Sequence, residues 1–379
     1  MKHIPFNRPR LAGREIEYIN EALEAGQLAG DGMFTERCQA LLSSQLAGRH
    51  VLLTHSCTAA LEMSAMLCGI GPGDEVIMPS YTFVSTANAV VLRGGTPVFV
   101  DIRQDTLNLD EQLIEAAITE RTKAIWPVHY AGVPAEMSEI GRIAEKHGLF
   151  VVEDAAQALG SSYEGRPAGA LGDLAAISFH ETKNVICGEG GALVIGRPEL
   201  LERAEIIREK GTNRKRFFRG AVDKYTWVEP GSSFLPGELI AAFLLAQLEK
   251  APIINDERKA LWSKYNAALQ TFAERGVQLT RLPDNVTHNG HLFYLIMPQA
   301  EQRQELISRM RDERVLTPFH YVSLHDSPGG KLYGRTAGAL PVTEMVSERL
   351  LRLPLYRGMG SDCDHVIERL HAHLDEILG

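Results

Sequence analysis

Short apolar segments alternate with longer segments of helical periodicity through the first two thirds of the chain. The predicted strands cover 51–54, 76–79, 96–102, 124–129, 149–154, 174–180 and 191–196. The helical patterns between them cover 58–68, 83–93, 109–118 and 136–147. This alternation favours a mainly parallel sheet with helices on both faces, so the predicted fold class is α/β. The almost continuous apolar character of several strands is typical of strands covered on both sides.

Beyond about residue 200 the pattern becomes mostly helical. Helices are predicted over 200–210 and 239–250, with a basic and aromatic loop between them. Further on, the patterns indicate a helix over 255–275, a strand over 291–297, a helix over 301–314 and a strand-like segment after it. We therefore predict a large α/β domain over residues 1–250 and a smaller α+β domain over residues 251–379.

The composition is that of an ordinary globular protein, with 45% hydrophobic and 23% charged residues among 379. Lys and Arg total 39 and Asp and Glu total 48, which gives a net charge of −9. An acidic chain lacks the broad basic surface that nucleic-acid binding requires, so no nucleic-acid partner is expected. A small basic site for an anionic ligand remains compatible with this balance.

Cysteine usage and apolar segments bear on the cellular compartment. The five cysteines form an odd number and no CxxC pair, which argues against a disulfide framework or a zinc site. Reduced thiols in a cytoplasm are expected instead. The first ten residues contain no apolar segment of a secretory signal. The apolar run Leu239–Leu248 is about half the ~20 residues that span a bilayer, so no membrane association is expected.

Sequence motifs exclude two nucleotide-binding classes. No GxGxxG follows the first strand and no GxxxxGK[ST] occurs, so neither a dinucleotide fold nor a P-loop is predicted. His320 and His325 lie close in sequence without a third candidate ligand, and no metal site is expected.

The strongest chemical pattern combines Asp154 and Lys183. Asp154 ends one predicted strand, and Lys183 follows shortly after another. In parallel sheets functional residues gather beyond the carboxyl ends of the strands. A carboxylate and a lysine at this edge could simply form an ion pair. They could also be the two residues that bind pyridoxal phosphate, with the carboxylate at the ring nitrogen and the lysine bonded to the aldehyde. The spacing alone leaves both interpretations open.

A second pattern is the polar loop around Thr58, which joins the first strand to a helix. The free N–H groups at a helix start, together with the Thr58 hydroxyl, can bind a phosphate. An ordinary helix cap by Ser56 or Thr58 explains the same residues.

Other polar and aromatic residues follow strand ends. Phe83 and Tyr81 are candidates to stack on a flat ligand ring, with core packing as the alternative. Ser178 could add a hydroxyl to a phosphate site, and Gln157 could donate to a phenolic oxygen.

Taken together, these segments resemble the DegT/DnrJ/EryC1/StrS family of sugar-nucleotide aminotransferases. The matching segments are IPFNRP (4–9), GDGMFTERCQ (30–39), SCTAALEM (56–63), GPGDEVIMPSYTFVSTANAV (71–90), PVFVDI (97–102), PVHYAG (127–132), VVEDAAQALG (151–160), SFHETKN (178–184), GEGGALV (188–194) and LLRLPLY (350–356). The resemblance covers nearly the whole chain. It implies the fold type I architecture of pyridoxal-phosphate enzymes.

The resemblance also implies roles for individual residues. Lys183 would bond pyridoxal 5'-phosphate and move the proton, and Asp154 would pair with the pyridine nitrogen. The other implied cofactor contacts are the phosphate positions Thr58, Ala59 and Ser178, the ring-oxygen position Gln157 and the stacked aromatic Phe83. His325 matches a histidine that lines the substrate pocket.

On the substrate side, the family implies transfer of an amino group from L-glutamate to a nucleotide-linked 4-keto-6-deoxy sugar. An acidic protein needs a local cationic patch for such a diphosphate, and the basic loop supplies Lys210, Arg214, Lys215, Arg216, Arg219 and Lys224. A solvated basic loop is the alternative interpretation.

The family also implies a cytoplasmic homodimer. Many members carry a phosphate-binding asparagine from the partner subunit where this chain has Leu235. The resemblance therefore does not extend to that side chain.

Three rival functions remain at this level. The first is amino transfer to C3 or to another nucleotide sugar. The second is a sugar 3-dehydratase, which replaces the lysine by histidine and is disfavoured by Lys183. The third is a non-catalytic regulator that kept the fold.

Overall fold

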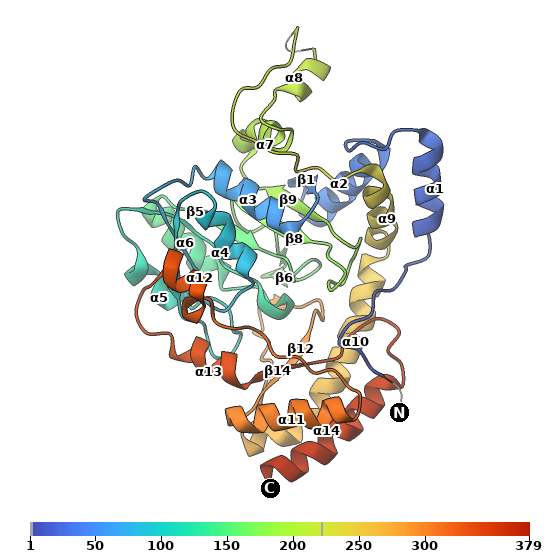
Figure 1. Ribbon diagram of the computed structural model, residues 1–379, viewed down its shortest axis with the longest axis vertical. Coiled ribbons are helices and arrows are strands. Elements are labelled where there is room, and N and C mark those ends of the chain that lie inside the picture. The colour runs from blue at the N-terminus through green and yellow to red at the C-terminus, as the bar shows by residue number, and fades with distance from the viewer. Residues whose placement is uncertain (1–2, 221–222) are drawn as a thin grey trace.

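The computed structural model describes residues 3–220 and 223–379, and its main element is a sheet of eight strands (Figure 1). The strands lie in the order β1 (His50–Thr54), β9 (Gly191–Ile195), β8 (Leu174–Ser178), β5 (Phe150–Asp154), β4 (Thr122–Ile125), β2 (Glu75–Pro79), β3 (Thr96–Val100) and β13 (Arg335–Thr336). β9 is antiparallel to both neighbours, and the remaining pairs are parallel. The predicted mainly parallel sheet is confirmed, and all strands except β9 end at the same edge.

Several predicted strands end earlier than expected, and β4 differs by the most residues. The sequence favoured a strand over 124–129, whereas β4 ends at Ile125. Pro127 has no backbone N–H to continue the ladder. Its carbonyl still accepts a hydrogen bond of 2.9 Å from the amide of Asp154. The loop after β4 thus stays attached to the end of β5.

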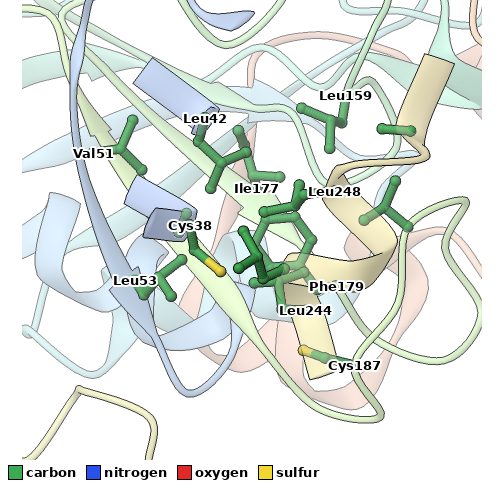
Figure 2. Packing of buried hydrophobic residues seen from close by; sticks show 14 of the residues in the cluster. Cys38, Leu42, Val51, Leu53, Leu159, Ile177, Phe179, Cys187, Leu244 and Leu248 are labelled. Carbon is green, nitrogen blue, oxygen red and sulfur yellow. The ribbon is translucent and has the colours of Figure 1, made fainter. Parts of the chain in front are cut away.

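Neighbouring residues of each strand point to opposite faces, and helices cover both. Ala176 of β8 packs with one cluster, which includes residues of the helices α3 (Cys57–Leu67), α4 (Val84–Val91) and α7 (Leu201–Arg208). Ile177 packs on the opposite face with residues of α2 (Met33–Gln45) and α9 (Glu238–Leu248), as Figure 2 shows. Farther along this face lie α5 (Glu111–Ala117) and α6 (Met137–His147), while α1 (Glu15–Ala25) packs on α9. Burial on both faces explains the apolar strands.

The C-terminal region builds a second, smaller sheet below the first (Figure 1). Its antiparallel strands are β10 (Gln278–Leu279), β12 (Phe293–Ile296) and β14 (Leu350–Leu353). Its helices are α10 (Ala251–Leu269), α11 (Ala300–Asp312), α13 (Pro341–Arg349) and α14 (Asp362–Leu378). This arrangement agrees with the helices and the strand predicted over 255–275, 291–297 and 301–314.

Shorter elements complete the chain. They are α8 (Arg214–Phe218), α12 (Pro328–Tyr333), β6 (Ser162–Tyr163), β7 (Arg166–Pro167), β11 (Val286–Thr287) and the 3-10 turns η1 (Tyr130–Gly132), η2 (Pro198–Leu200), η3 (Gln270–Arg275) and η4 (Leu324–Asp326). Across the described residues, no helix has both the length and the apolar content needed to cross a membrane.

Two connections cross the predicted boundary at residue 250. β13 lies late in the sequence but joins the large sheet beside β3. Ile4, near the start of the chain, packs in the core of the C-terminal region and pairs with Val315. The division into 1–250 and 251–379 stays a prediction.

Candidate active site

A cavity of about 510 Å³ opens beyond the carboxyl ends of the parallel strands. Asp154 ends β5 and Ser178 ends β8, and both side chains line this cavity together with Lys183. The C-terminal region closes the other side with Arg352 of β14 and Tyr321. We call this space the Lys183 cavity; its size lies within the range of about 300–1,000 Å³ typical of small-molecule sites.

Asp154 is held in one orientation by two hydrogen bonds. Its Oδ2 accepts a bond of 2.7 Å from the Thr86 hydroxyl, and its Oδ1 accepts one of 3.2 Å from the Ala156 amide. The residue is only 5% exposed. A buried carboxylate fixed in this way is oriented to face a positively charged group in the cavity.

Lys183 lies in the segment between β8 and β9, where its amide donates to the carbonyl of His180 at 2.9 Å. Burial is the main influence on this side chain and lowers its pKa, while Cys57 and Asp154 partly oppose that effect. A lowered pKa increases the fraction of neutral amine at a given pH. Neutral amine is the form that acts as a nucleophile or accepts a proton.

The start of α3 forms the polar wall that the sequence suggested for a phosphate. Ser56 caps the helix, because its hydroxyl accepts a hydrogen bond of 3.0 Å from the Ala59 amide. The Thr58 hydroxyl lies 2.8 Å from the Ser85 hydroxyl, and both residues line the Lys183 cavity. The cap and the phosphate site are therefore compatible interpretations, since first-turn N–H groups of α3 remain for an anion.

Ala59, the other predicted phosphate position in this loop, is not among the residues that line the cavity. Its amide donates to Ser56, and the residue is buried at the packed side of α3 and not along the cavity. Its hydrogen bond belongs to the cap, which supports the loop from behind.

Gly191 explains why a glycine-rich segment follows the lysine. A Cβ atom at this position would lie 2.4 Å from the backbone nitrogen of Cys57. Only glycine lets β9 approach the start of α3 this closely.

Gln157 and Phe83, which the sequence suggested as contacts of the cofactor ring, both line the Lys183 cavity. The Gln157 Oε1 accepts from the Ala131 amide at 2.7 Å, which directs its Nε2 to the Tyr321 hydroxyl at 3.1 Å. Phe83 is 59% exposed and presents its ring at the cavity. Tyr81, the other aromatic candidate, is instead fully buried and donates its hydroxyl hydrogen to the His320 carbonyl.

The predicted substrate-side residues do not gather around Lys183. Lys210 and Arg219 line a separate cavity of about 900 Å³, together with Leu235; we call it the Lys210 cavity. Lys224 is exposed and lines neither cavity. His325 lies behind the Lys183 cavity, where its Nδ1 is 2.7 Å from the Ser80 hydroxyl.

Three of the cations that line the Lys210 cavity have carboxylate partners. Arg219 donates to Glu205 at 2.6 Å, and the Lys215 amine lies 3.4 Å from Asp31. Lys210 lies 3.4 Å from Glu209. The basic loop is therefore less cationic than its sequence suggests.

The sequence reasoning missed several cavity residues, among them five polar side chains of the C-terminal region. They are Arg258, His291, His320, Tyr321 and Arg352. Burial lowers the pKa of His320 well below its ordinary value, and its Nδ1 lies 3.0 Å from the Tyr130 hydroxyl. The motif LLRLPLY contains Arg352, but nothing in the motif itself indicated that the arginine faces Lys183.

The geometry fits a phosphorylated pyridine aldehyde. The cavity offers an amine at Lys183, a fixed carboxylate at Asp154 and hydroxyls with helix-start amides around Thr58. Those three groups correspond to the aldehyde, the ring nitrogen and the phosphate of pyridoxal phosphate. Fold and site together define the class of fold type I enzymes that depend on this cofactor.

Comparison with known proteins places the chain within that class. Residues 9–371 match the DegT/DnrJ/EryC1/StrS aminotransferase family, so the chain belongs to that family and is a pyridoxal-phosphate-dependent aminotransferase. The chain is 33% identical to DesV from S. venezuelae, solved in complex with a ketimine intermediate (TM-score 0.90; 99% of both chains covered).

Two further structures extend the comparison. DesI, solved in the presence of its TDP-sugar product, is 30% identical with a TM-score of 0.89, and the match covers 99% of this chain and 93% of DesI. A protein from Streptococcus pneumoniae described as a sugar aminotransferase, solved in its PLP form, is 27% identical with a TM-score of 0.91, covering 100% of both chains.

Proposed function

We propose that the protein transfers the amino group of L-glutamate to C4 of dTDP-4-dehydro-6-deoxy-D-glucose. The products would be dTDP-4-amino-4,6-dideoxy-D-galactose and 2-oxoglutarate. The observation that carries amino transfer is the half-buried Lys183, which lines the same cavity as the fixed carboxylate of Asp154. The TDP-sugar product bound by DesI supports a nucleotide-linked sugar as the acceptor.

The choice of this sugar rests on a finer likeness. Residues 208–234 and 178–184 resemble the dTDP-4-amino-4,6-dideoxygalactose transaminase of enterobacterial common antigen synthesis. That enzyme acts on the C4 ketone named above. Transfer to C3, or to a different nucleotide sugar, is the alternative that a product analysis must separate.

When bound, pyridoxal phosphate supplies an electron-accepting ring to the carbon that loses its proton. Asp154 would keep the ring nitrogen protonated, because its two hydrogen-bond donors hold the carboxylate oriented in the cavity. Lys183 would take the proton from the donor carbon and deliver it to the acceptor carbon, since burial lowers the pKa of its amine and the side chain lines the cavity. Thr58, Ser85 and the first turn of α3 would hold the phosphate.

The sugar diphosphate requires a partner subunit in this proposal. Lys210 and Arg219 line their own cavity, so they can meet a ligand of Lys183 only if a second copy of the chain brings them there. We therefore propose a homodimer, with the Lys210 cavity of one subunit beside the Lys183 cavity of the other.

We also propose a reducing cytoplasm as the compartment, in keeping with the free thiols of Cys38, Cys57, Cys68, Cys187 and Cys363.

The deciding experiment supplies L-glutamate with a panel of keto-sugar nucleotides. Formation of 2-oxoglutarate with only dTDP-4-dehydro-6-deoxy-D-glucose, and an NMR spectrum of the product with nitrogen at C4, is the expected result. Nitrogen at C3, or turnover with another sugar alone, would replace the proposed substrate. An absence of amino transfer from any donor would contradict the enzyme assignment itself.

A further inference from the structure

Arg352 is a cation that lines the Lys183 cavity, and among the described residues no carboxylate forms an ion pair with it. It lies on β14 between Leu351 and Leu353, which are fully buried in the core of the C-terminal region. Because side chains alternate along a strand, Arg352 points away from that core. It reaches the cavity instead.

The hydrogen bonds of Arg352 leave part of its guanidinium free. Its Nη2 donates to the Phe319 carbonyl at 3.0 Å, and the ring of Phe6 covers one face, 4.3 Å from the central carbon. Its Nε is buried and has no hydrogen-bond partner among the described residues. Burial lowers the pKa of Arg352, and the neighbours that oppose this effect are tyrosine hydroxyls. A desolvated cation in this state favours an anion.

Arg258 lines the same cavity but differs in its bonding. Its Nε donates to the Gly290 carbonyl at 3.1 Å, and its Nη2 donates to the carbonyl of His291. Two backbone carbonyls therefore occupy the donors that a ligand would need. The positive charge of Arg352, and not that of Arg258, is one of the influences that lower the pKa of Lys183. Arg352 is the better placed cation for a group that reacts at Lys183.

We propose that Arg352 binds the α-carboxylate of the amino donor through the free side of its guanidinium. This inference rests on the proposed function and names the residue that recognises its donor. The α-carboxylate shares a carbon with the reacting amino group, so it must lie close to Lys183. The diphosphate of the acceptor is attached at C1, across the sugar ring from the reacting C4, and so lies farther away. A planar guanidinium also matches the two oxygens of a carboxylate.

The test compares the holoenzyme with Arg352→Gln and Arg352→Lys. Glutarate, a dicarboxylate without an amino group, is titrated by calorimetry as the binding probe. Arg352→Gln should raise the Kd for glutarate at least about 30-fold. This factor corresponds to ~2 kcal/mol, the lower bound for removing one partner of a buried charge pair. The Kd of Arg352→Lys for glutarate should lie between those of the wild type and Arg352→Gln, because lysine keeps the charge but lacks the planar pair of donors of the guanidinium. It also tests the proposal if the glutamine variant fails to fold.

Arg275→Gln is the matched control. Arg275 also lies against a phenylalanine, 5.3 Å from the Phe272 ring, but it is paired with Asp375 outside both cavities. Its replacement should leave glutarate binding unchanged. In steady state, Arg352→Gln should raise the KM for L-glutamate and leave that for the nucleotide sugar within about threefold.

Two outcomes would overturn the assignment. One is unchanged glutarate binding in a folded Arg352→Gln protein. The other is an equal loss of affinity for the nucleotide sugar, which would assign Arg352 to the diphosphate. A wild-type enzyme that transfers no amino group from L-glutamate would contradict the proposed function instead, so the two failures are distinguishable.

Discussion

The Lys183 cavity and the Lys210 cavity both contain cationic side chains, but they differ in whether carboxylates are paired with those cations. In the Lys183 cavity, Arg352 is half-buried near tyrosine hydroxyls, and its Nε has no hydrogen-bond partner in the part of the chain that the structure describes. In the Lys210 cavity, Arg219 and Lys215 are paired with Glu205, and Lys215 also lies near Asp31. A ligand gains most from a charge that has no internal partner, because no existing ion pair must be broken first. By this argument the Lys183 cavity, whose motif LLRLPLY contains a single arginine, is a stronger anion-binding site than the Lys210 cavity at the basic loop.

The largest expected effect is at Lys183. Lys183→Ala or Lys183→Arg should lower turnover by at least about 10³-fold, because both remove the nucleophilic amine that bonds the cofactor and moves the proton. The loss should be accompanied by loss of the absorbance of the lysine-bound cofactor. Circular dichroism should show a folded protein. Activity retained in either variant would contradict the role given to this cavity.

Asp154→Asn should reduce kcat by about 10²-fold, since the amide keeps the shape but removes the charge opposite the ring nitrogen. The measurement is kcat at saturating cofactor. Asp173→Asn is a matched control, because Asp173 pairs with Arg197 and lies outside both cavities. Equal losses in the two variants would mean that Asp154 acts only through stability.

Arg219→Ala tests the Lys210 cavity and should have a smaller effect. If the diphosphate of the nucleotide sugar contacts Arg219, the KM for the nucleotide sugar should rise about tenfold at unchanged kcat. A modest effect is expected because this cation is exposed to solvent screening and already paired. Arg216→Ala is the control, since Arg216 pairs with Glu202 and does not line the cavity. Mixing Lys183→Ala with Arg219→Ala subunits should restore sites with wild-type KM if the dimer shares its sites. No such recovery would contradict the shared arrangement.

The smallest expected effect is a shift in pH dependence. Burial and the charge of Arg352 both lower the pKa of Lys183. Removal of that charge in Arg352→Gln should raise the Lys183 pKa, so its neutral amine would form at higher pH. The rising limb of the rate of amino transfer to the keto sugar should therefore move up by roughly half a pH unit. A shift to lower pH would show that the two residues are not coupled in this way.

The residues that could be predicted from the sequence are those fixed by local rules. Asp154 and Ser178 stand at strand ends, and the apolar strands before them made both the sheet and the edge recognisable. The cap at Ser56 and the loop at Thr58 likewise follow from a strand-to-helix turn. These elements need only neighbours in sequence to be placed.

The other side of the cavity could not be found in this way. Arg352 reaches Lys183 because β14 pairs with β12 in a sheet that packs across the large one, and no local pattern encodes that contact. His325 was predicted to line the pocket, whereas His320 does so. The sequence suggested that the cations of the basic loop are available to a ligand, because their carboxylate partners Glu205 and Asp31 come from other segments of the chain.

The short strand β13 has a consequence for solubility. It pairs with β3 at Val98 and Phe99, where unpaired backbone N–H and C=O groups would otherwise lie along an open edge. Arg335 holds β13 in place through two hydrogen bonds to Glu75, at 3.0 and 2.6 Å. An open edge of this kind can template pairing with strands of other molecules. Two residues from the far end of the sequence therefore protect the large sheet against aggregation.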